Sequence, residues 1–134
     1  MTRRAAAVEP VATPSGPPVA GPYSAAVRAG DWVIVSGQIP IDRETGELVD
    51  GGIGVQVEQV LANLAAVLGD CGLGLEHLAK TTVYVTDLGE FPTVNDVYAR
   101  VLGEHRPSRA TVEVAALPLG ARVEIEAWAF APGR

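Results

Sequence analysis

The stretch PSRATVEV, residues 107–114, decides the predicted fold because polar and apolar side chains alternate along it behind a proline. Successive side chains of a strand point to opposite faces of a sheet, so this alternation predicts a strand. One face then carries Arg109, Thr111 and Glu113, and the other carries Ala110, Val112 and Val114. The predicted strand has a polar face headed by a cation and an apolar face for packing.

A second alternating run covers residues 122–127, after a turn at residues 117–120. Glu124 and Glu126 are two positions apart in this run and therefore share one face. If the two runs are neighbouring strands, Arg109 and Glu124 lie on one surface. We therefore expect the chemistry of the protein on this surface.

Two amphipathic helices are predicted in the remaining chain. Apolar residues recur at steps of three and four over residues 53–71, and Gly72 follows where a C-terminal cap belongs. A second helix begins near Asp87, has Pro92 in its first turn and ends at Gly103. Both helices have one apolar face to bury.

Three further runs of residues are predicted to be strands. Residues 25–28 and 32–36 form a hairpin around a two-residue Gly-Asp turn, and residues 81–86 alternate and are rich in β-branched side chains. The strand after the first helix then completes a strand-helix-strand unit, which predicts a parallel pair. A short edge strand fits within residues 6–13.

The element order is therefore β-β-β-α-β-α-β-β, which predicts a single α+β domain with a six-stranded mixed sheet and two helices on one face. Five prolines lie within residues 9–22 and favour an extended N-terminal arm. We expect a flexible arm with a possible edge strand at residues 1–11, the domain at residues 12–131 and a tail at residues 132–134.

Two helices cover only one face of such a sheet. The other face carries large apolar side chains, namely Trp32, Ile34, Tyr84, Trp128 and Phe130. An apolar face of this size is unusual on a monomer. We therefore expect a homo-oligomer with sites where subunits meet.

The composition of the chain argues against several classes of partner. The chain has 134 residues, 10 Lys and Arg and a net charge of −6, which argues against a nucleic-acid partner. Its one cysteine cannot form an internal disulfide, and no apolar run reaches the roughly 20 residues that span a bilayer. We expect a cytoplasmic protein without a membrane partner. His77 and His105 lack a second ligand at suitable spacing, so no metal site is predicted.

Arg109 is the main candidate for chemistry because a half-buried guanidinium calls for an anion, and its planar fork matches a carboxylate. The structural alternative is an ion pair with Glu113, Glu124 or Glu126. Glu124 and Glu126 lie roughly 6.5 to 7 Å apart by strand rise, so one pKa should be raised. They could be an acid and base pair, as in glycosidases, or one could position a water while the other pairs with Arg109 or Arg122.

With these residues in place, the chain resembles the RidA (YjgF) family of reactive-imine deaminases. The resemblance covers residues 12–130 and rests on several short motifs in order: GPYS at 21–24, VSGQIP at 35–40, KTTVYV at 80–85, VNDVY at 94–98, PSRATVEV at 107–114 and VEIE at 123–126. It implies a chorismate-mutase-like homotrimer with clefts between subunits, which agrees with the uncovered face.

The resemblance also implies a cofactor-free hydrolysis of 2-imino acids, such as 2-iminobutanoate and 2-iminopropanoate, to 2-keto acids and ammonia. Arg109 matches the family's carboxylate-binding arginine, and Glu124 matches its water-positioning glutamate. Tyr23, Ser36 and Asn95 match pocket residues. Thr111 is a further expected substrate-binding residue, at a position where many members have cysteine. The alternatives are a non-catalytic keto- or imino-acid binding protein, a pathway-specific paralogue, or, against the acidic charge, a ribonuclease or translation inhibitor.

Overall fold

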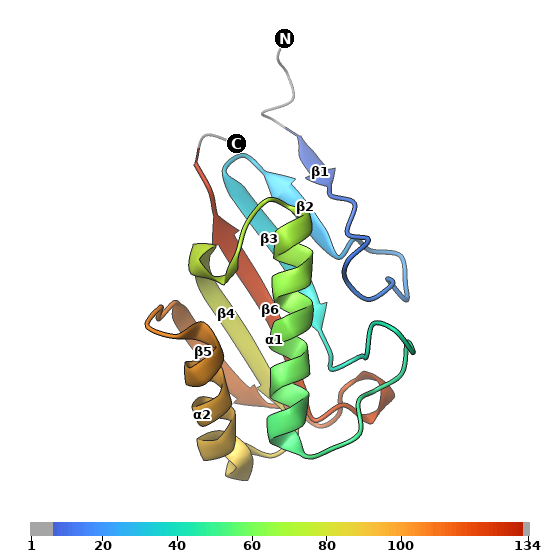
Figure 1. The fold of residues 1–134 in the computed structure, drawn as a ribbon, viewed down its shortest axis with the longest axis vertical. Helices are drawn as coiled ribbons and strands as arrows, with labels where there is room; N and C mark the ends of the chain where they lie inside the picture. Colours follow the sequence, from blue (N-terminus) through green and yellow to red (C-terminus); the bar gives the residue numbers. More distant parts are fainter. Residues whose placement is uncertain (1–6, 133–134) are drawn as a thin grey trace.

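A computed structural model of the chain describes residues 7–132, and these form one sheet with two helices packed on it (Figure 1). The elements follow the predicted β-β-β-α-β-α-β-β order, which is confirmed. Their bounds are β1 Val8–Pro10, β2 Ala26–Ala29, β3 Trp32–Gln38, α1 Ile53–Asp70, β4 Leu78–Val85, α2 Phe91–Leu102, β5 Ser108–Glu113 and β6 Val123–Phe130. Short 3-10 turns at Leu75–His77 (η2), Leu88–Glu90 (η3) and Pro118–Gly120 (η4) connect them.

The strand order across the sheet is β1-β2-β3-β6-β4-β5. Two predictions of neighbours are therefore wrong. β5 and β6 are not adjacent, because β4 lies between them. The strands flanking α1 are not a pair either, since β6 separates β3 from β4; the parallel pair is β4 with β5, which α2 connects. Alternation fixes the faces of a strand but not its neighbours, and the eight-residue β6 satisfies backbone groups on both sides.

The helices end where the sequence predicts. Gly72 after α1 has a φ of 79°, in the left-handed region, and the next amide, that of Leu73, donates to the carbonyl of Leu68 at 2.8 Å. Pro92 lies in the first turn of α2, and Gly103 follows it with a φ of 66°. Asp87 caps η3, the turn that leads into α2.

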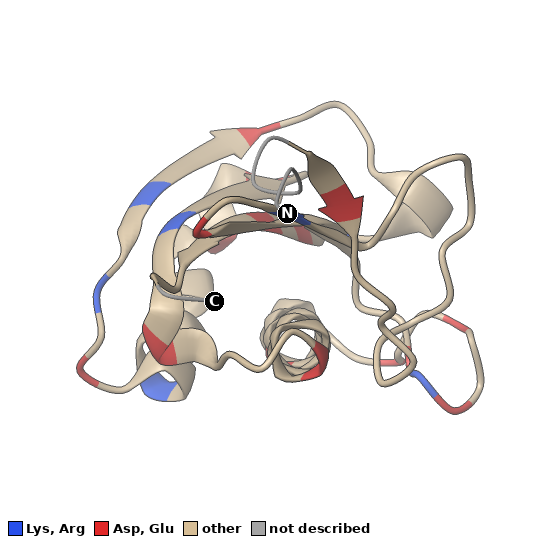
Figure 2. Cartoon of the chain, turned by 90° about the horizontal axis from the view of Figure 1, so that it is seen from above, with Lys and Arg blue, Asp and Glu red and all other residues tan. Residues whose placement is uncertain are grey.

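Both helices lie on the same side of the sheet (Figure 2). Fully buried side chains such as Leu61, Val83 and Ile125 fill the space between the sheet and the helices. On the opposite face Trp32 packs edge-on against Trp128 and Phe130, with ring centroids 5.8 and 5.0 Å away. This uncovered face was predicted, and Trp128 remains 43% and Phe130 41% exposed on it.

Part of the N-terminal arm belongs to the sheet. Val8–Pro10 form β1 and pair antiparallel with β2 at its edge. Residues 1–6 of the expected flexible arm, and residues 133–134 of the expected tail, lie outside the described residues. Neither α1 nor α2 combines the length and the apolar character that a bilayer crossing requires, judged over residues 7–132.

Candidate active site

Arg109 projects from β5 toward α2, on the helix-covered side of the sheet. Its guanidinium donates to Oδ1 of Asn95 at 2.7 Å and lies 4.9 Å from the ring centroid of Tyr98 and 5.4 Å from that of Phe91. Two aromatic faces and one amide thus hold a half-buried cation in place. We call Arg109, Asn95, Phe91 and Tyr98 the arginine cluster.

Within a single chain, the structural alternative for Arg109 is wrong. Within residues 7–132, the ion pairs of the structure join other residues, and no carboxylate pairs with Arg109. Glu113 accepts the amide hydrogen of Leu88 at 2.8 Å instead. The expected pairing of Arg122 with Glu124 or Glu126 is also wrong, because Arg122 forms an ion pair with Glu90. Among residues 7–132, the cation of Arg109 is therefore placed without a carboxylate beside it.

A buried hydrogen bond ties the arginine cluster to the sheet. The hydroxyls of Tyr98 and Thr81 lie 2.6 Å apart, and both residues are buried. Burial raises the pKa of Tyr98, so its hydroxyl stays neutral. The ring that supports Arg109 is thus anchored to β4. Sequence reasoning placed Tyr98 in the core only, although Phe91, Asn95 and Tyr98 at steps of four and three share one helix face.

Glu124 and Glu126 project from β6 on the uncovered face. Burial, followed by the nearby charge of Glu126, raises the pKa of Glu124. The sequence predicted that one of these two pKa values is raised. Tyr84 on β4 lies opposite Glu124, and its pKa is also raised, by burial and then by Glu126. We call Glu124, Glu126 and Tyr84 the glutamate cluster.

A bulge in β3 brings Gly37 against the glutamate cluster. The register between β3 and β6 shifts between Val35 and Gln38, so two residues of β3 face one of β6. A Cβ on Gly37 would overlap the Glu124 carboxylate. Glycine is therefore required here by close approach rather than by an unusual φ. The sequence motif contained this glycine, but its spacing alone did not predict the contact.

Tyr23 and Ser36 lie beside this bulge. The Ser36 hydroxyl donates to the carbonyl of Ser24 at 2.7 Å, which ties the loop of Tyr23 to β3. Tyr23 is 54% exposed and lines a pocket together with Gly37. Of the two side chains, that of Tyr23 is the one available to a ligand.

Thr111 lies two residues after Arg109 and on the same face of β5. Its Oγ1 atom is buried and lacks a hydrogen-bond partner among the described residues. A buried hydroxyl without a partner costs stability. No sequence pattern predicts this buried, unpartnered hydroxyl, because burial at an edge strand depends on how α2 and η3 pack.

The predicted site residues thus fall into two groups on opposite faces of the sheet. Thr81, which pairs with Arg109 across β4 and β5, faces the helices, whereas Tyr84, which pairs with Glu124, faces away. The expectation that Arg109 and Glu124 share one surface is wrong for a single chain. Asn95 joins Arg109, while Tyr23 and Ser36 lie near Gly37 on the side of Glu124.

Fold and site define a two-layer α+β protein with polar clusters on both faces of one sheet. The profile of the family described as Endoribonuclease L-PSP matches residues 13–131. The chain belongs to this family, and the resemblance to RidA and YjgF proteins is confirmed.

Several relatives share most of their length with this chain. The RutC family protein PH0854 of Pyrococcus horikoshii is 45% identical over 91% of this chain and 97% of its own. The human 2-iminobutanoate/2-iminopropanoate deaminase is 40% identical over 90% of this chain and 88% of its own. The crystal structure of Escherichia coli TdcF with bound serine superposes with a TM-score of 0.86 at 38% identity, covering 91% of this chain and 98% of that one. Relatives at about 40% identity are thus named imine deaminases, which supports an enzyme role for the family.

Proposed function

We propose that this protein is a hydrolytic deaminase that converts 2-imino acids to 2-keto acids and ammonia. The observation that carries the proposal is Arg109, a half-buried cation held by two aromatic rings and Asn95, with no carboxylate beside it among residues 7–132. Its fork is free to bind the carboxylate of a substrate. The name of the human relative supports the choice of imino acid.

The proposed reaction needs only water as a co-reactant. The oxygen of water bonds to C2 of the imino acid, the C=N π electrons move to nitrogen, and protons from water complete an amino alcohol. Collapse of this intermediate breaks the C–N bond, forms the C=O bond and releases ammonia. Arg109 orients the substrate, and the Glu124 carboxylate accepts a hydrogen bond from the attacking water. The raised pKa of Glu124 makes it a stronger proton acceptor than an ordinary glutamate.

Arg109 and Glu124 lie on opposite faces of one sheet, so one chain alone does not bring them together. We propose that each site combines Arg109 of one copy with Glu124 of another in a homotrimer. The exposed rings on the uncovered face, Trp128 and Phe130 among them, support association. Sedimentation should give a mass near three times 13.9 kDa. A monomer at micromolar concentration would contradict the proposal.

The activity is tested by generating an imine with an amino-acid oxidase and trapping it with semicarbazide. Catalytic amounts of the protein should reduce the trapped imine and increase the keto acid. A non-catalytic binding protein would reduce trapping only in proportion to its own concentration. Unchanged trapping at stoichiometric protein would remove the deaminase proposal. RNA cleavage in a parallel assay would favour the activity in the family's description, although acidic side chains outnumber basic ones by 16 to 10.

A further inference from the structure

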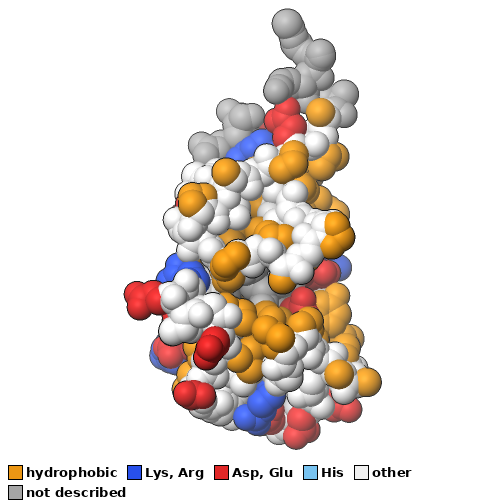
Figure 3. All heavy atoms as spheres, turned by 90° about the vertical axis from the view of Figure 1, so that its right-hand side faces the viewer, with side chains coloured by type: hydrophobic (Ala, Val, Ile, Leu, Met, Phe, Trp, Pro, Cys, Tyr) orange, Lys and Arg blue, Asp and Glu red, His pale blue; other side chains and the backbone are white. Residues whose placement is uncertain are grey.

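A pocket opens beside the glutamate cluster, between the segment after β1, the end of β3 and η4. Its cavity volume is about 290 Å³. Its walls are mainly apolar and include Pro18, Val19, Tyr23, Ile39, Ile41 and Leu119. Figure 3 faces this side of the molecule and shows apolar side chains gathered around a hollow. A water molecule occupies about 30 Å³ in the liquid, so the pocket has room for a large side chain.

The pocket offers little to a polar group. Gln38 lines it, but its amide nitrogen donates to the Ser36 carbonyl at 3.1 Å, and the residue is buried. Gly37 forms part of the wall, and a Cβ added to it would overlap the Glu124 carboxylate, so the pocket and Glu124 are separated by little more than this glycine. A molecule whose reacting carbon lies at Glu124 could therefore place an apolar substituent past Gly37 into the pocket.

Leu119 adds an independent observation at the mouth of the pocket. Its φ is 60°, the left-handed region that leucine rarely adopts, and its side chain is 72% exposed. It is the one non-glycine residue with a positive φ in the described part of the chain. Disfavoured backbone conformations persist where the surroundings enforce them, and they cluster at ligand sites. The turn of η4 holds an apolar side chain in solvent at the entrance of an apolar pocket.

We propose that this pocket is the side-chain subsite of the deaminase, and that the protein prefers 2-imino acids whose apolar side chains are of leucine size or larger. This inference rests on the proposed function. Burial of each added methylene in the pocket should raise kcat/KM about fourfold. Leu119 acts as a specificity residue at the entrance, through contact with the substrate side chain.

The test uses imines generated from alanine, 2-aminobutanoate, norvaline and leucine, with semicarbazide trapping. For the wild type, kcat/KM should increase along this series. Leu119→Asp should reduce kcat/KM at least about tenfold for the leucine imine and leave the alanine imine within about twofold. Val55→Asp, at a 46% exposed residue of α1 outside the pocket, is the matched control and should leave kcat/KM for both imines unchanged.

Binding measured by calorimetry separates this inference from the proposed function. Pyruvate and 4-methyl-2-oxopentanoate serve as probes, and the larger acid should bind at least about tenfold more tightly, a preference that Leu119→Asp removes. Equal affinities, or equal effects of Leu119→Asp on both substrates, would overturn the subsite. If no imine is hydrolysed but the two affinities differ as expected, the deaminase proposal fails and the subsite stands.

Discussion

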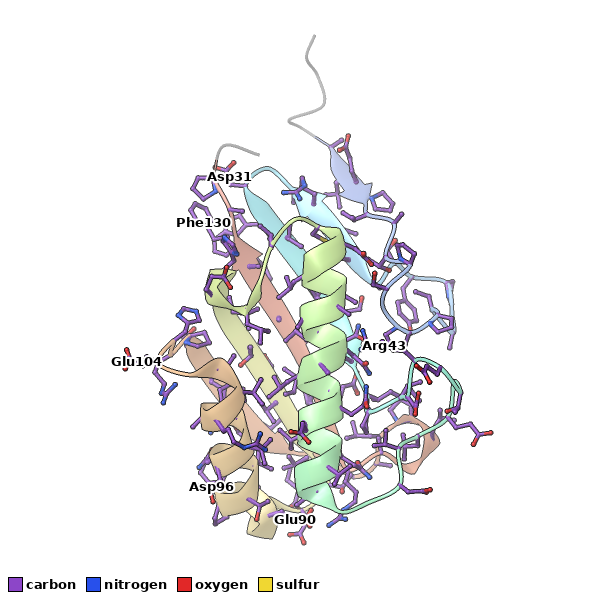
Figure 4. The ribbon with its side chains drawn as sticks, in the orientation of Figure 1. Asp31, Arg43, Glu90, Asp96, Glu104 and Phe130 are labelled. Atoms are coloured by element: carbon purple, nitrogen blue, oxygen red, sulfur yellow. The ribbon has the colours of Figure 1, made fainter. Side chains whose placement is uncertain are left out.

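Arg109 donates to the Oδ1 atom of Asn95 at 2.7 Å, and this amide is its one side-chain hydrogen bond among residues 7–132. The next residue, Asp96, is exposed and lies at the outer edge of α2 (Figure 4). The acidic residue nearest in sequence to Asn95 therefore does not neutralise Arg109. A neutral partner holds the cation in position and leaves its charge available to an anion.

Arg109→Lys tests whether the planar fork matters. Lysine keeps the charge but loses bidentate binding, so activity should drop at least about tenfold, or roughly 1.4 kcal/mol of transition-state binding, in a protein that stays folded. Kinetics and thermal unfolding measure both effects. Arg106→Lys, at an exposed arginine of the preceding loop, is the control and should change neither the activity nor the melting temperature. A destabilised but fully active Arg109→Lys protein would reject the site assignment.

Asn95→Asp tests whether Arg109 must lack a carboxylate partner in the protein to bind the carboxylate of the substrate. The new carboxylate would pair with Arg109 and compete with the carboxylate of the substrate, so KM should rise while the melting temperature is kept or increased. Thr93→Asp adds the same charge at an exposed position of α2 and is the control. An unchanged KM for Asn95→Asp would show that substrate binds elsewhere.

The pH dependence of activity should report Glu124. The glutamate must be ionised to draw a proton from the attacking water, so activity falls as pH drops through its pKa, which burial and Glu126 raise. Glu126→Gln removes the charge of Glu126 and leaves the effect of burial on the pKa of Glu124. The acid limb of the rate profile should therefore move to lower pH but stay above that of an ordinary glutamate.

The control for this shift is Glu104→Gln. Glu104 lies in the exposed loop after α2 and points outward (Figure 4), so its substitution removes the same charge outside the glutamate cluster. Rates are measured as the ratio to uncatalysed imine hydrolysis, which itself depends on pH. If Glu126→Gln and Glu104→Gln shift the acid limb equally, the net charge of the protein, rather than Glu126 itself, determines the pH at which activity falls.

Two threonines on neighbouring strands should respond to valine in opposite ways. Thr111 has a buried hydroxyl without a partner among the described residues, so Thr111→Val should raise the free energy of unfolding by about 1 kcal/mol. The hydroxyl of Thr81 lies 2.6 Å from that of Tyr98, so Thr81→Val should lower it by about 1–3 kcal/mol.

Urea unfolding of both variants measures the difference. Activity of Thr111→Val should stay within about threefold of wild type, because a small side chain suffices at this position. If Thr111→Val is destabilised, the hydroxyl has a partner in the assembled protein, and the explanation of its orphan state is wrong.

The sequence predicts which face of a strand a side chain occupies better than it predicts which strands are neighbours in the sheet. Alternation placed Glu124 and Trp128 on one face of β6, and the structure agrees. It could not place β4 between β5 and β6, because strand order depends on which backbone edges are satisfied in the whole sheet. The separation of Arg109 from Glu124 follows from this order and from the direction in which each strand presents its side chains.

Arg109 and Glu124 are proposed to act together across two copies of the chain. Arg109→Ala and Glu124→Ala variants should each be inactive alone. After unfolding and refolding as an equal mixture, each interface has about one chance in four of combining an intact arginine with an intact glutamate, so about a quarter of the wild-type activity should return. No recovery in a mixture that forms mixed trimers would show that Arg109 and Glu124 do not share a site between two copies.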